Sequence, residues 1–304
     1  MKRRNDDILW KSILEEVFDD LLRFLFPKAG KLFNLQRRCE FLDKELARIY
    51  PEPEKKPDTK FVDKLVKVYQ QDGTEEWVLV HIEVQGRYDP LFAKRMLKYY
   101  CRIFDRFDRP MTAIAIFSGR DGQKLSGRYE CSYQGSVLTY QYNTLCILDY
   151  DDKYLMASDN PFALVVLAAK KALLRGKDLD EELLKQKLLI AKLLYRKGFR
   201  KRKIHAILSF LHNYVSFAKP ETNRIFEKEL EKISGKKNTM DIFEAVAEIR
   251  AAEALEKGIR KGRAAEKTRV VRRLLARKGF TIKKIADIVD VSVAFVEKVK
   301  KAKK

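Results

Sequence analysis

The chain has 304 residues, 46% of them hydrophobic, and its 64 Lys and Arg outnumber its 43 Asp and Glu to give a formal net charge of +21. This length and apolar content allow one large core or two ordinary ones, which excludes a disordered chain. The positive charge argues against an enzyme of small neutral substrates and favours a polyanionic partner, of which nucleic acid is the simplest.

Two further features bear on location. No stretch of eighteen apolar residues is present, and the N-terminal MKRRNDDILWKSILEE lacks the apolar core of a signal peptide. We therefore expect a cytoplasmic protein with no membrane partner, although an anionic membrane surface would also attract this charge. Because the cysteines are scattered and only three histidines accompany them, we expect four buried or half-buried thiols and no zinc site: Cys39, Cys101, Cys131 and Cys146.

The first predicted element is an amphipathic helix at residues 6–26, where apolar residues recur at helical spacing and Pro27 follows. Residues 51–60, PEPEKKPDTK, indicate a loop before the first core strand, because three of the eight prolines fall within it. Four of the acids on this helix are candidates for a function, although a solvated face is the simplest interpretation of each: Glu15, Glu16, Asp19 and Asp20.

Residues 61–85, FVDKLVKVYQQDGTEEWVLVHIEVQ, predict two strands joined by a turn that contains an Asp-Gly pair. Side chains alternate between the faces of a strand, so His81, Glu83 and Gln85 share one face. In a hairpin, Asp63 would lie across from the Glu83 end. The simplest alternative is a hairpin whose polar face only meets solvent.

Asp63 and Glu83 on neighbouring strands would form a hard oxygen site suited to Mg²⁺ or Mn²⁺. Such an ion lowers the pKa of a bound water and offsets the charge that develops on a phosphodiester. Gln85 can orient the water or a phosphate oxygen, but it supplies no positive charge. His81 fits a hydrogen-bonding neighbour of the site better than a metal ligand.

A helix is predicted from Asp89-Pro90 to about Phe107, and its bases follow the Glu83 strand closely enough to reach a phosphate backbone. The residues concerned are Lys94, Arg95 and Lys98, with Tyr99 one turn beyond Arg95; a solvated face and ordinary packing are the alternatives. A buried strand at 112–118 and two β-rich runs within 128–149 are expected to extend the sheet, which gives an α/β (α+β) fold.

Strand signals end at Asn160, and the rest of the chain is predicted to be helical at 161–175, 180–197, 201–217, 221–233 and 239–256. Within it, LLYRKGFRKRKIHAI at 193–207 and LLARKGFTIKKIADI at 274–288 share nine of fifteen positions. Both predict a helix, a Gly-Phe turn and the start of a second helix.

The tail at 251–304 holds seventeen Lys or Arg against six Asp or Glu, about half of the net charge. GFTIKKIADIVDVSVAFVEKVKK resembles a helix-turn-helix with the turn at Asp290-Val291 and Ser292 as N-cap. In that case Lys283 and Lys284 would contact DNA. A basic helical tail that packs on another subunit, or binds phosphate without reading sequence, explains the pattern equally well.

The Asp63, Glu83-x-Gln85 arrangement is similar to the PD-(D/E)xK nuclease superfamily, in its variant with Gln in place of Lys. With FLDKELARIY at 41–50, helix 93–107 and TAIAIFSG at 112–119 in the same order, residues 5–220 resemble the recombination-promoting nuclease (Rpn) family of transposase-like proteins. The resemblance implies a restriction-endonuclease-like mixed sheet flanked by helices. It further implies a nuclease core at 1–155, a helical region at 156–250 and a basic tail with a helix-turn-helix-like fold at 251–304.

The function implied by the resemblance is a metal-dependent DNA endonuclease associated with recombination or transposition. Glu16 would add an acid to the metal site, and Arg95 and Tyr99 match positions that complete the site in that family. Two alternatives stay open. One is a weak or inactive DNA-binding accessory protein, because Gln85 lacks the charge of Lys, and the other is a basic scaffold that needs no metal. A homo-oligomer is compatible with each.

Overall fold

The computed structural model describes residues 6–42, 61–83, 90–109, 111–120, 126–174, 179–235, 266–276, 280–289, 291 and 293–301. At positions 7, 61–63, 81–83, 287, 294, 298 and 301 it describes the backbone alone. The chain divides into two compact units, Met1–Ile242 and Phe243–Lys304.

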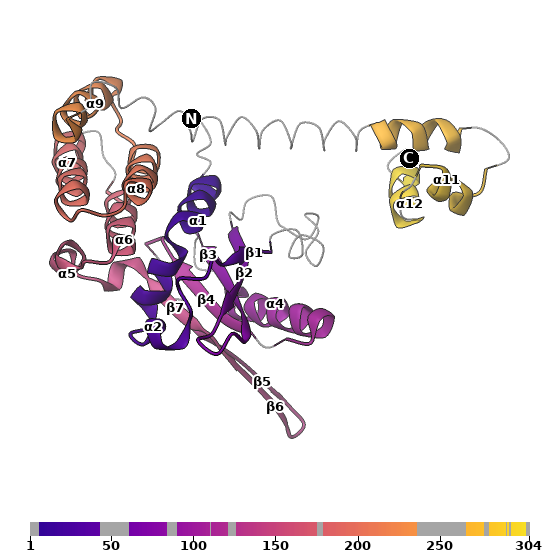
Figure 1. Cartoon of the computed structure of the whole chain (residues 1–304). Helices are drawn as coiled ribbons and strands as arrows, with labels where there is room; N and C mark the ends of the chain where they lie inside the picture. Colours follow the sequence, from indigo (N-terminus) through magenta and orange to yellow (C-terminus); the bar gives the residue numbers. More distant parts are fainter. Residues whose placement is uncertain are drawn as a thin grey trace. The chain divides into compact units, whose positions relative to one another are not determined.

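A five-stranded mixed sheet forms the centre of the first unit (Figure 1), in the order β1–β2–β3–β4–β7. β1, β2 and β3 pair antiparallel, and β3, β4 and β7 pair parallel. The prediction of a mixed sheet flanked by helices is confirmed. The strands are β1 (Glu40–Phe41), β2 (Phe61–Tyr69), β3 (Glu75–Glu83), β4 (Met111–Phe117) and β7 (Asn143–Cys146).

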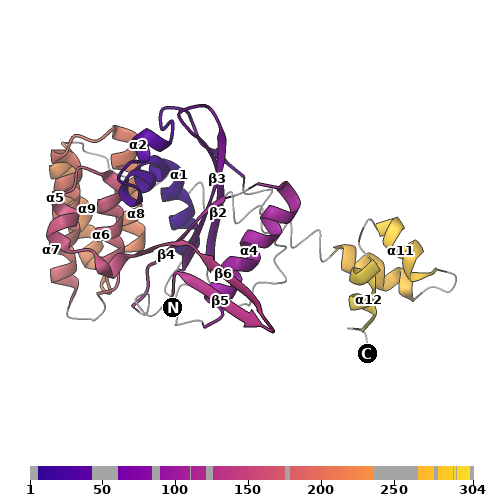
Figure 2. The same cartoon turned by 90° about the horizontal axis from the view of Figure 1, so that it is seen from below.

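Helices α1 (Asp6–Leu25) and α4 (Phe92–Phe107) lie on opposite faces of this sheet (Figure 2). Successive side chains of β2 point to opposite faces of the sheet and so contact different helices. Lys64 reaches Glu15 of α1, whereas Leu65 packs with Tyr99 and Ile103 of α4. A short helix, α2 (Ala29–Leu32), connects α1 with β1. The predicted helix at 6–26 and the helix ending at Phe107 are thus confirmed.

The β-rich segment after β4 behaves differently from the prediction. Among the described strands of this segment, β7 alone joins the central sheet, whereas β5 (Arg128–Tyr133) and β6 (Ser136–Gln141) pair with each other as a separate hairpin. The expectation that both runs extend the sheet is wrong for β5 and β6. Most side chains on both hairpin faces are exposed, whereas a strand inside this sheet is covered on both faces.

A helical layer follows: the 3₁₀ turn η3 (Ile147–Asp149), then α5 (Asp152–Ala157), α6 (Pro161–Lys171), α7 (Asp180–Arg196), α8 (Lys201–Tyr214) and α9 (Pro220–Ser234). α6 is buried from Pro161 to Ala169 and packs against α1, α5, α7 and α8. Asn160 caps it by accepting a hydrogen bond from the Phe162 N–H at 2.9 Å. The predicted helices agree to within a few residues, and 239–256 lies outside the described residues.

Trp10 anchors α1 to this layer. Its ring meets Phe210 at 5.1 Å and Tyr214 at 5.8 Å between centroids, both on α8. The indole is fully buried. Sheet and helical layer therefore share α1, which packs on β2 and on α8.

The expected burial of the cysteines is correct for two of the four. Cys146 is buried and Cys39 half-buried, whereas Cys101 and Cys131 are exposed. Cys101 lies on the solvent side of α4 and Cys131 on the β5–β6 hairpin, which explains the error. Among the described helices, none combines the length and apolar character needed to span a bilayer.

The second unit contains a helical stretch at 266–275, α11 (Ile282–Val289) and α12 (Val293–Lys301). It has its own apolar cluster, made of Val271, Ile285, Ala286, Val296 and Val299. The two predicted tail helices are present, and both the predicted turn residue Asp290 and the predicted cap Ser292 lie outside the described residues.

Candidate metal and nucleic-acid site

The β2–β3 turn sets the geometry of the candidate site. Gly73 takes a positive φ of 89°, a conformation that favours glycine. The Thr74 N–H donates to Asp72 Oδ1 at 2.9 Å, and this bond lowers the pKa of the Asp72 carboxyl. The Asp-Gly pair of the sequence therefore forms the predicted hairpin turn.

The ladder register that follows from this turn brings the predicted ligands close in the backbone. Asp63 pairs with His81, and Phe61 pairs with Glu83. Positions 63 and 83 are thus diagonal neighbours, which in an antiparallel ladder are about 7–8 Å apart and belong to the same face. The predicted antiparallel pairing is confirmed, and Asp63 lies two ladder positions from Glu83.

The parity of the ladder also identifies the helix on that side of the sheet. Leu65 and Leu79 pair with each other and pack against α4. Every second position along a strand belongs to the same face, so positions 63 and 83 share the face of Leu65 and Leu79. The candidate ligands therefore continue the strand positions that face α4, beyond the apolar cluster that fixes the helix.

The side chains of Asp63, His81 and Glu83 and the whole of Gln85 lie outside the described residues. Within the described part of the chain, no group of three His, Cys, Asp or Glu side chains could hold a metal ion. The assignment of Asp63 and Glu83 as ligands therefore stays a prediction that rests on residue chemistry and backbone register.

α4 places its predicted phosphate-binding residues in different environments. Lys94 and Lys98 are exposed, and Arg95 is half-buried over the ring of Phe92, with its guanidinium carbon 5.1 Å from the ring centre. Tyr99 is 2% exposed within the cluster beneath the helix. The two lysines are thus open to a ligand, while Tyr99 occupies a core position.

The four candidate acids of α1 are paired with cations of the first unit. Glu16 forms a two-pronged ion pair with the Arg202 guanidinium of α8, in which Nη2 and Oε1 are 2.6 Å apart. Lys203 donates to both oxygens of Asp19 at 3.1 Å and to Asp20 at 2.5 Å. The structure thus places Glu16 against α8. Its predicted role as an additional acid of the metal site stays untested.

Burial raises the pKa of Asp20, and the hydrogen bond from Lys203 opposes that rise. The fourth acid, Glu15, contacts the ammonium of Lys64 at 2.5 Å. The Lys64 side chain is 2% exposed, and this ion pair joins α1 to β2. Nothing in the spacing of the sequence predicted that a strand lysine would be buried beneath α1.

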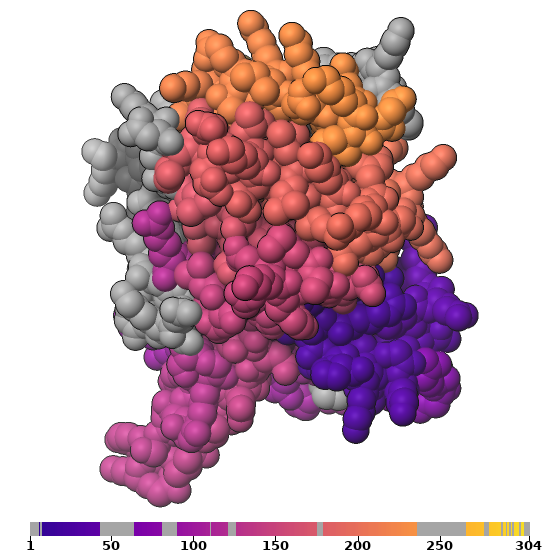
Figure 3. Space-filling model, turned by 90° about the vertical axis from the view of Figure 1, so that its left-hand side faces the viewer, coloured from indigo at the N-terminus to yellow at the C-terminus, as the bar shows by residue number. Residues whose placement is uncertain are grey.

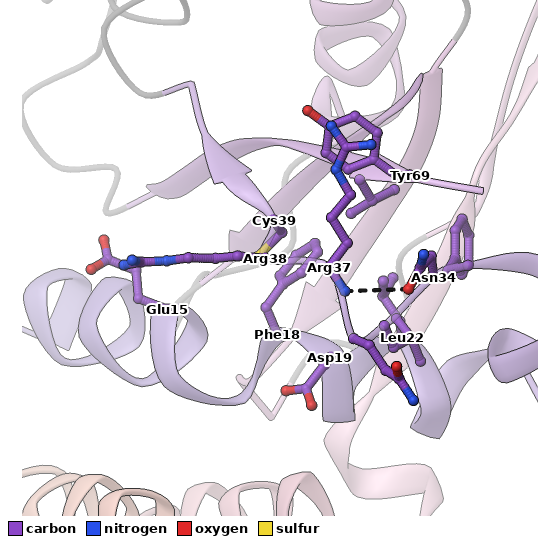
Figure 4. A pocket seen from close by; sticks show the side chains of 13 residues that line it. Glu15, Phe18, Asp19, Leu22, Asn34, Arg37, Arg38, Cys39 and Tyr69 are labelled. Atoms are coloured by element: carbon purple, nitrogen blue, oxygen red, sulfur yellow. Dashed lines mark hydrogen bonds between the residues drawn. The ribbon is translucent and has the colours of Figure 1, made fainter. Parts of the chain in front are cut away.

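A small cavity of about 160 Å³ lies between α1, the segment 33–39 and the end of β2 (Figure 4). Arg37 stacks on Tyr69, with 3.2 Å from its guanidinium carbon to the ring centre, and the backbone N–H of Arg37 donates to Asn34 Oδ1 at 3.3 Å. Glu15 and Asp19 contribute carboxylates to the wall. No local sequence pattern indicates this cavity, because its walls come from three separated segments.

In the second unit, Lys283 and Lys284 are exposed on α11. The described residues of this unit place no carboxylate in an ion pair with either lysine, whereas the aligned bases Arg202 and Lys203 are paired with α1. The two predicted DNA contacts are therefore available to an external anion.

Comparison with protein-family models, with curated proteins and with solved structures yields no match for this chain. The class of protein that the fold defines is a mixed α/β protein with a central sheet and flanking helices, followed by a separate basic helical unit.

Proposed function

We propose that this chain is a divalent-metal-dependent DNA endonuclease whose metal ion is held by Asp63 and Glu83. The observation that supports this most strongly is the β2–β3 register, which makes the two acids diagonal neighbours. Two carboxylates at such positions offer the hard oxygen ligands that Mg²⁺ and Mn²⁺ prefer. The donor chemistry of the residues thus fits the proposed ion.

When bound, the ion would supply Lewis-acid stabilisation and a water of lowered pKa. The remaining roles belong to the chain. Gln85, two positions beyond Glu83, would orient the attacking water or a phosphate oxygen through its amide. The exposed Lys94 and Lys98 of α4 would hold the phosphate backbone on the side of the sheet to which positions 63 and 83 belong.

Packing beneath α4 supports a rigid site. Trp77, Leu79 and Leu65 form one cluster with Tyr99 and Ile103, so the strands that carry the acids are fixed against the helix that carries the lysines. A site on packed strands and helices holds its geometry better than one on loops. We assign Tyr99 to this packing role.

Basic residues of the second unit would add affinity for DNA. Lys283 and Lys284 project from a helix that has an apolar cluster of its own behind it. Contacts of lysine with phosphate strengthen binding without regard to sequence and weaken with salt. We further propose that α11 and α12 form a helix-turn-helix in which α12 contacts the DNA bases.

A second candidate is a DNA-binding accessory protein of recombination or transposition that keeps the fold and cleaves weakly or not at all. The separate basic unit favours it, because DNA can be bound there without any contribution from the sheet. Gln85 also favours it, since an uncharged amide stabilises developing negative charge less than an ammonium does.

Cleavage of supercoiled plasmid with and without Mg²⁺ separates the two candidates. Asp63→Asn and Glu83→Gln should each lower the Mg²⁺-dependent rate by at least about 100-fold while DNA affinity stays unchanged. Glu75→Gln is the matched control, because Glu75 lies on the same strand with the same parity, at its far end. It should cleave at the rate of the unaltered protein.

Cleavage that survives Asp63→Asn or Glu83→Gln would refute the metal assignment. An unaltered protein that binds plasmid but never cleaves it would support the accessory candidate.

A further inference from the structure

The β5–β6 hairpin, called the arm, stands out from the rest of the first unit (Figures 1 and 3). Its two strands are joined by Gln134 and Gly135, whose positive φ values of 44° and 85° are typical of a tight hairpin turn. At its base, the Tyr142 N–H donates to the Gly127 oxygen at 3.0 Å, and the Tyr142 hydroxyl donates to the Ser126 oxygen at 2.5 Å. The base is therefore fixed, and the rest of the arm extends from it.

The two faces of the arm differ in character. One carries the pairs Tyr129–Tyr140, Cys131–Leu138 and Tyr133–Ser136, and the other carries Arg128–Gln141, Glu130–Thr139 and Ser132–Val137. The first face is aromatic and apolar, and Tyr133 at its tip is 77% exposed. Exposed aromatic groups of this kind are enriched where proteins meet other proteins.

The apolar face continues onto the body at the base of the arm. Tyr140 lies 5.1 Å from Tyr100 of α4 between ring centroids, and Tyr100 stacks on Phe104 at 5.8 Å. Phe104 is exposed. An aromatic stripe thus runs from α4 along the arm to its tip.

The strands of the arm carry no net charge. Its strands contain one base and one acid, Arg128 and Glu130, and these form an ion pair with each other. Arms that grip DNA need unpaired cations for the phosphates, so the arm is a poor match for nucleic acid. Two copies of a chain with net charge +21 repel each other, and an arm without net charge is a surface on which they can meet.

The edges of the arm are open. Among the described residues, β5 and β6 pair only with each other, and a two-stranded hairpin alone is marginally stable in water. Proteins normally protect free edges with charges or proline. β6, with the sequence SVLTYQ, has neither, whereas β5 has its ion pair.

We propose that the β6 edge of the arm pairs antiparallel with the β6 edge of a second copy of this chain, which forms a four-stranded sheet across a two-fold axis. In this arrangement the same surface serves both copies, as two-fold symmetry requires. The tip of each arm, with Tyr133, lies beside the base of the other, where α4 exposes Phe104. The inference is independent of the proposed nuclease activity.

Matched proline variants test this pairing. A two-residue turn closes on a hydrogen-bonded pair, here Tyr133 and Ser136, so the next pair, Ser132 and Val137, directs its backbone N–H and C=O groups outward. Val137→Pro removes an outward donor from the β6 edge, and Ser132→Pro removes the corresponding donor from the β5 edge. Both leave the hydrogen bonds within the hairpin in place.

Analytical ultracentrifugation of the full chain over a concentration series gives the readout. The unaltered protein should form a two-chain species, Val137→Pro should raise its dissociation constant by at least about tenfold, and Ser132→Pro should leave it unchanged. If Val137→Pro loses its native circular dichroism, Val137→Lys replaces it, since a lysine on an edge strand opposes pairing with another chain.

Three results would overturn the proposal. The first is a single-chain mass at every concentration, and the second is an equal response to the Ser132 and Val137 substitutions. The third is a Val137 variant that keeps its two-chain mass and instead loses DNA affinity, which would assign the arm to nucleic acid.

Discussion

The same fifteen-residue pattern occurs in both units and meets different surroundings in each. In the first unit it spans the end of α7 and the start of α8, and in the second it spans the end of the 266–275 helix and most of α11. Ile204 and its counterpart Ile285 are both buried. Ile207 is fully buried, whereas its counterpart Ile288 is 54% exposed.

The basic pair of the pattern differs in the same way. Arg202 and Lys203 are occupied by the carboxylates of Glu16, Asp19 and Asp20 on α1. Their counterparts Lys283 and Lys284 are exposed and have no such acidic helix among the described residues of their unit. A local pattern therefore specifies the helix, turn and helix, but the packed neighbour decides whether its bases stabilise the fold or remain available to a ligand.

The largest expected effect concerns the isoleucine pair. Ile207→Ala should lower the free energy of unfolding of the first unit by about 2–5 kcal/mol, because it leaves a cavity among buried side chains. Urea unfolding followed by tryptophan fluorescence measures this, since Trp10 and Trp77 are the two tryptophans and both lie in that unit.

The control for the isoleucine experiment is Ile288→Ala. The free energy of unfolding of its helix, followed by circular dichroism, should stay within about 0.5 kcal/mol of the value for the unaltered protein, because the Ile288 side chain is mostly exposed. Equal losses at both positions would contradict the difference in packing.

The next effect concerns the lysine that contacts Asp20. Lys203→Ala should cost about 1–3 kcal/mol of stability, because it leaves a buried carboxylate without its donor. Lys284→Ala, its aligned control, should stay within about 0.5 kcal/mol. Urea midpoints of the two variants give the comparison.

The loss in Lys203→Ala should depend on pH. Burial raises the pKa of Asp20, so the folded state binds a proton on this carboxyl more tightly than the unfolded state does. Protonation of Asp20 therefore favours folding at acidic pH, and this contribution to stability is lost as pH rises from 3.8 through the folded pKa. Without Lys203 the pKa rises further. The stability of Lys203→Ala should therefore approach that of the unaltered protein at acidic pH and fall below it as pH rises. A loss of stability that does not change with pH would contradict this account of Asp20.

The smallest expected effect is on DNA binding. Replacing both Lys283 and Lys284 with Ala should reduce the slope of log affinity against log salt by about 1.8, because each phosphate contact contributes about 0.9. Fluorescence anisotropy with a labelled duplex measures the slope. Arg202→Ala, whose guanidinium is already paired with Glu16, should leave it unchanged, and an unchanged slope in the double variant would remove α11 from the DNA contact.

Much of the fold was predictable from local patterns. The Asp-Gly turn and the alternation on either side of it predict the β2–β3 hairpin and so the closeness of positions 63 and 83. Helical spacing predicts α1 and α4, and Asn160-Pro161 marks the start of α6. Each of these features depends on residues close together in sequence.

The features that were missed depend on distant residues. The ion pair between Arg202 and Glu16 joins positions 186 residues apart, and no local pattern indicates which acid would neutralise which base. The separation of β5 and β6 from the sheet likewise depends on where the chain pairs with β4 again, which is at Asn143, directly after Tyr142. The exposure of Cys131 follows from that separation.

The most direct test of the central claim is the binding of Mn²⁺ by the protein without DNA, followed by electron paramagnetic resonance of the free ion. The account predicts that the unaltered protein removes free Mn²⁺ from solution, that Glu75→Gln does so equally, and that the double variant Asp63→Asn, Glu83→Gln does not. Equal uptake of Mn²⁺ by the double variant and the unaltered protein would contradict the assignment of the metal to the β2–β3 hairpin.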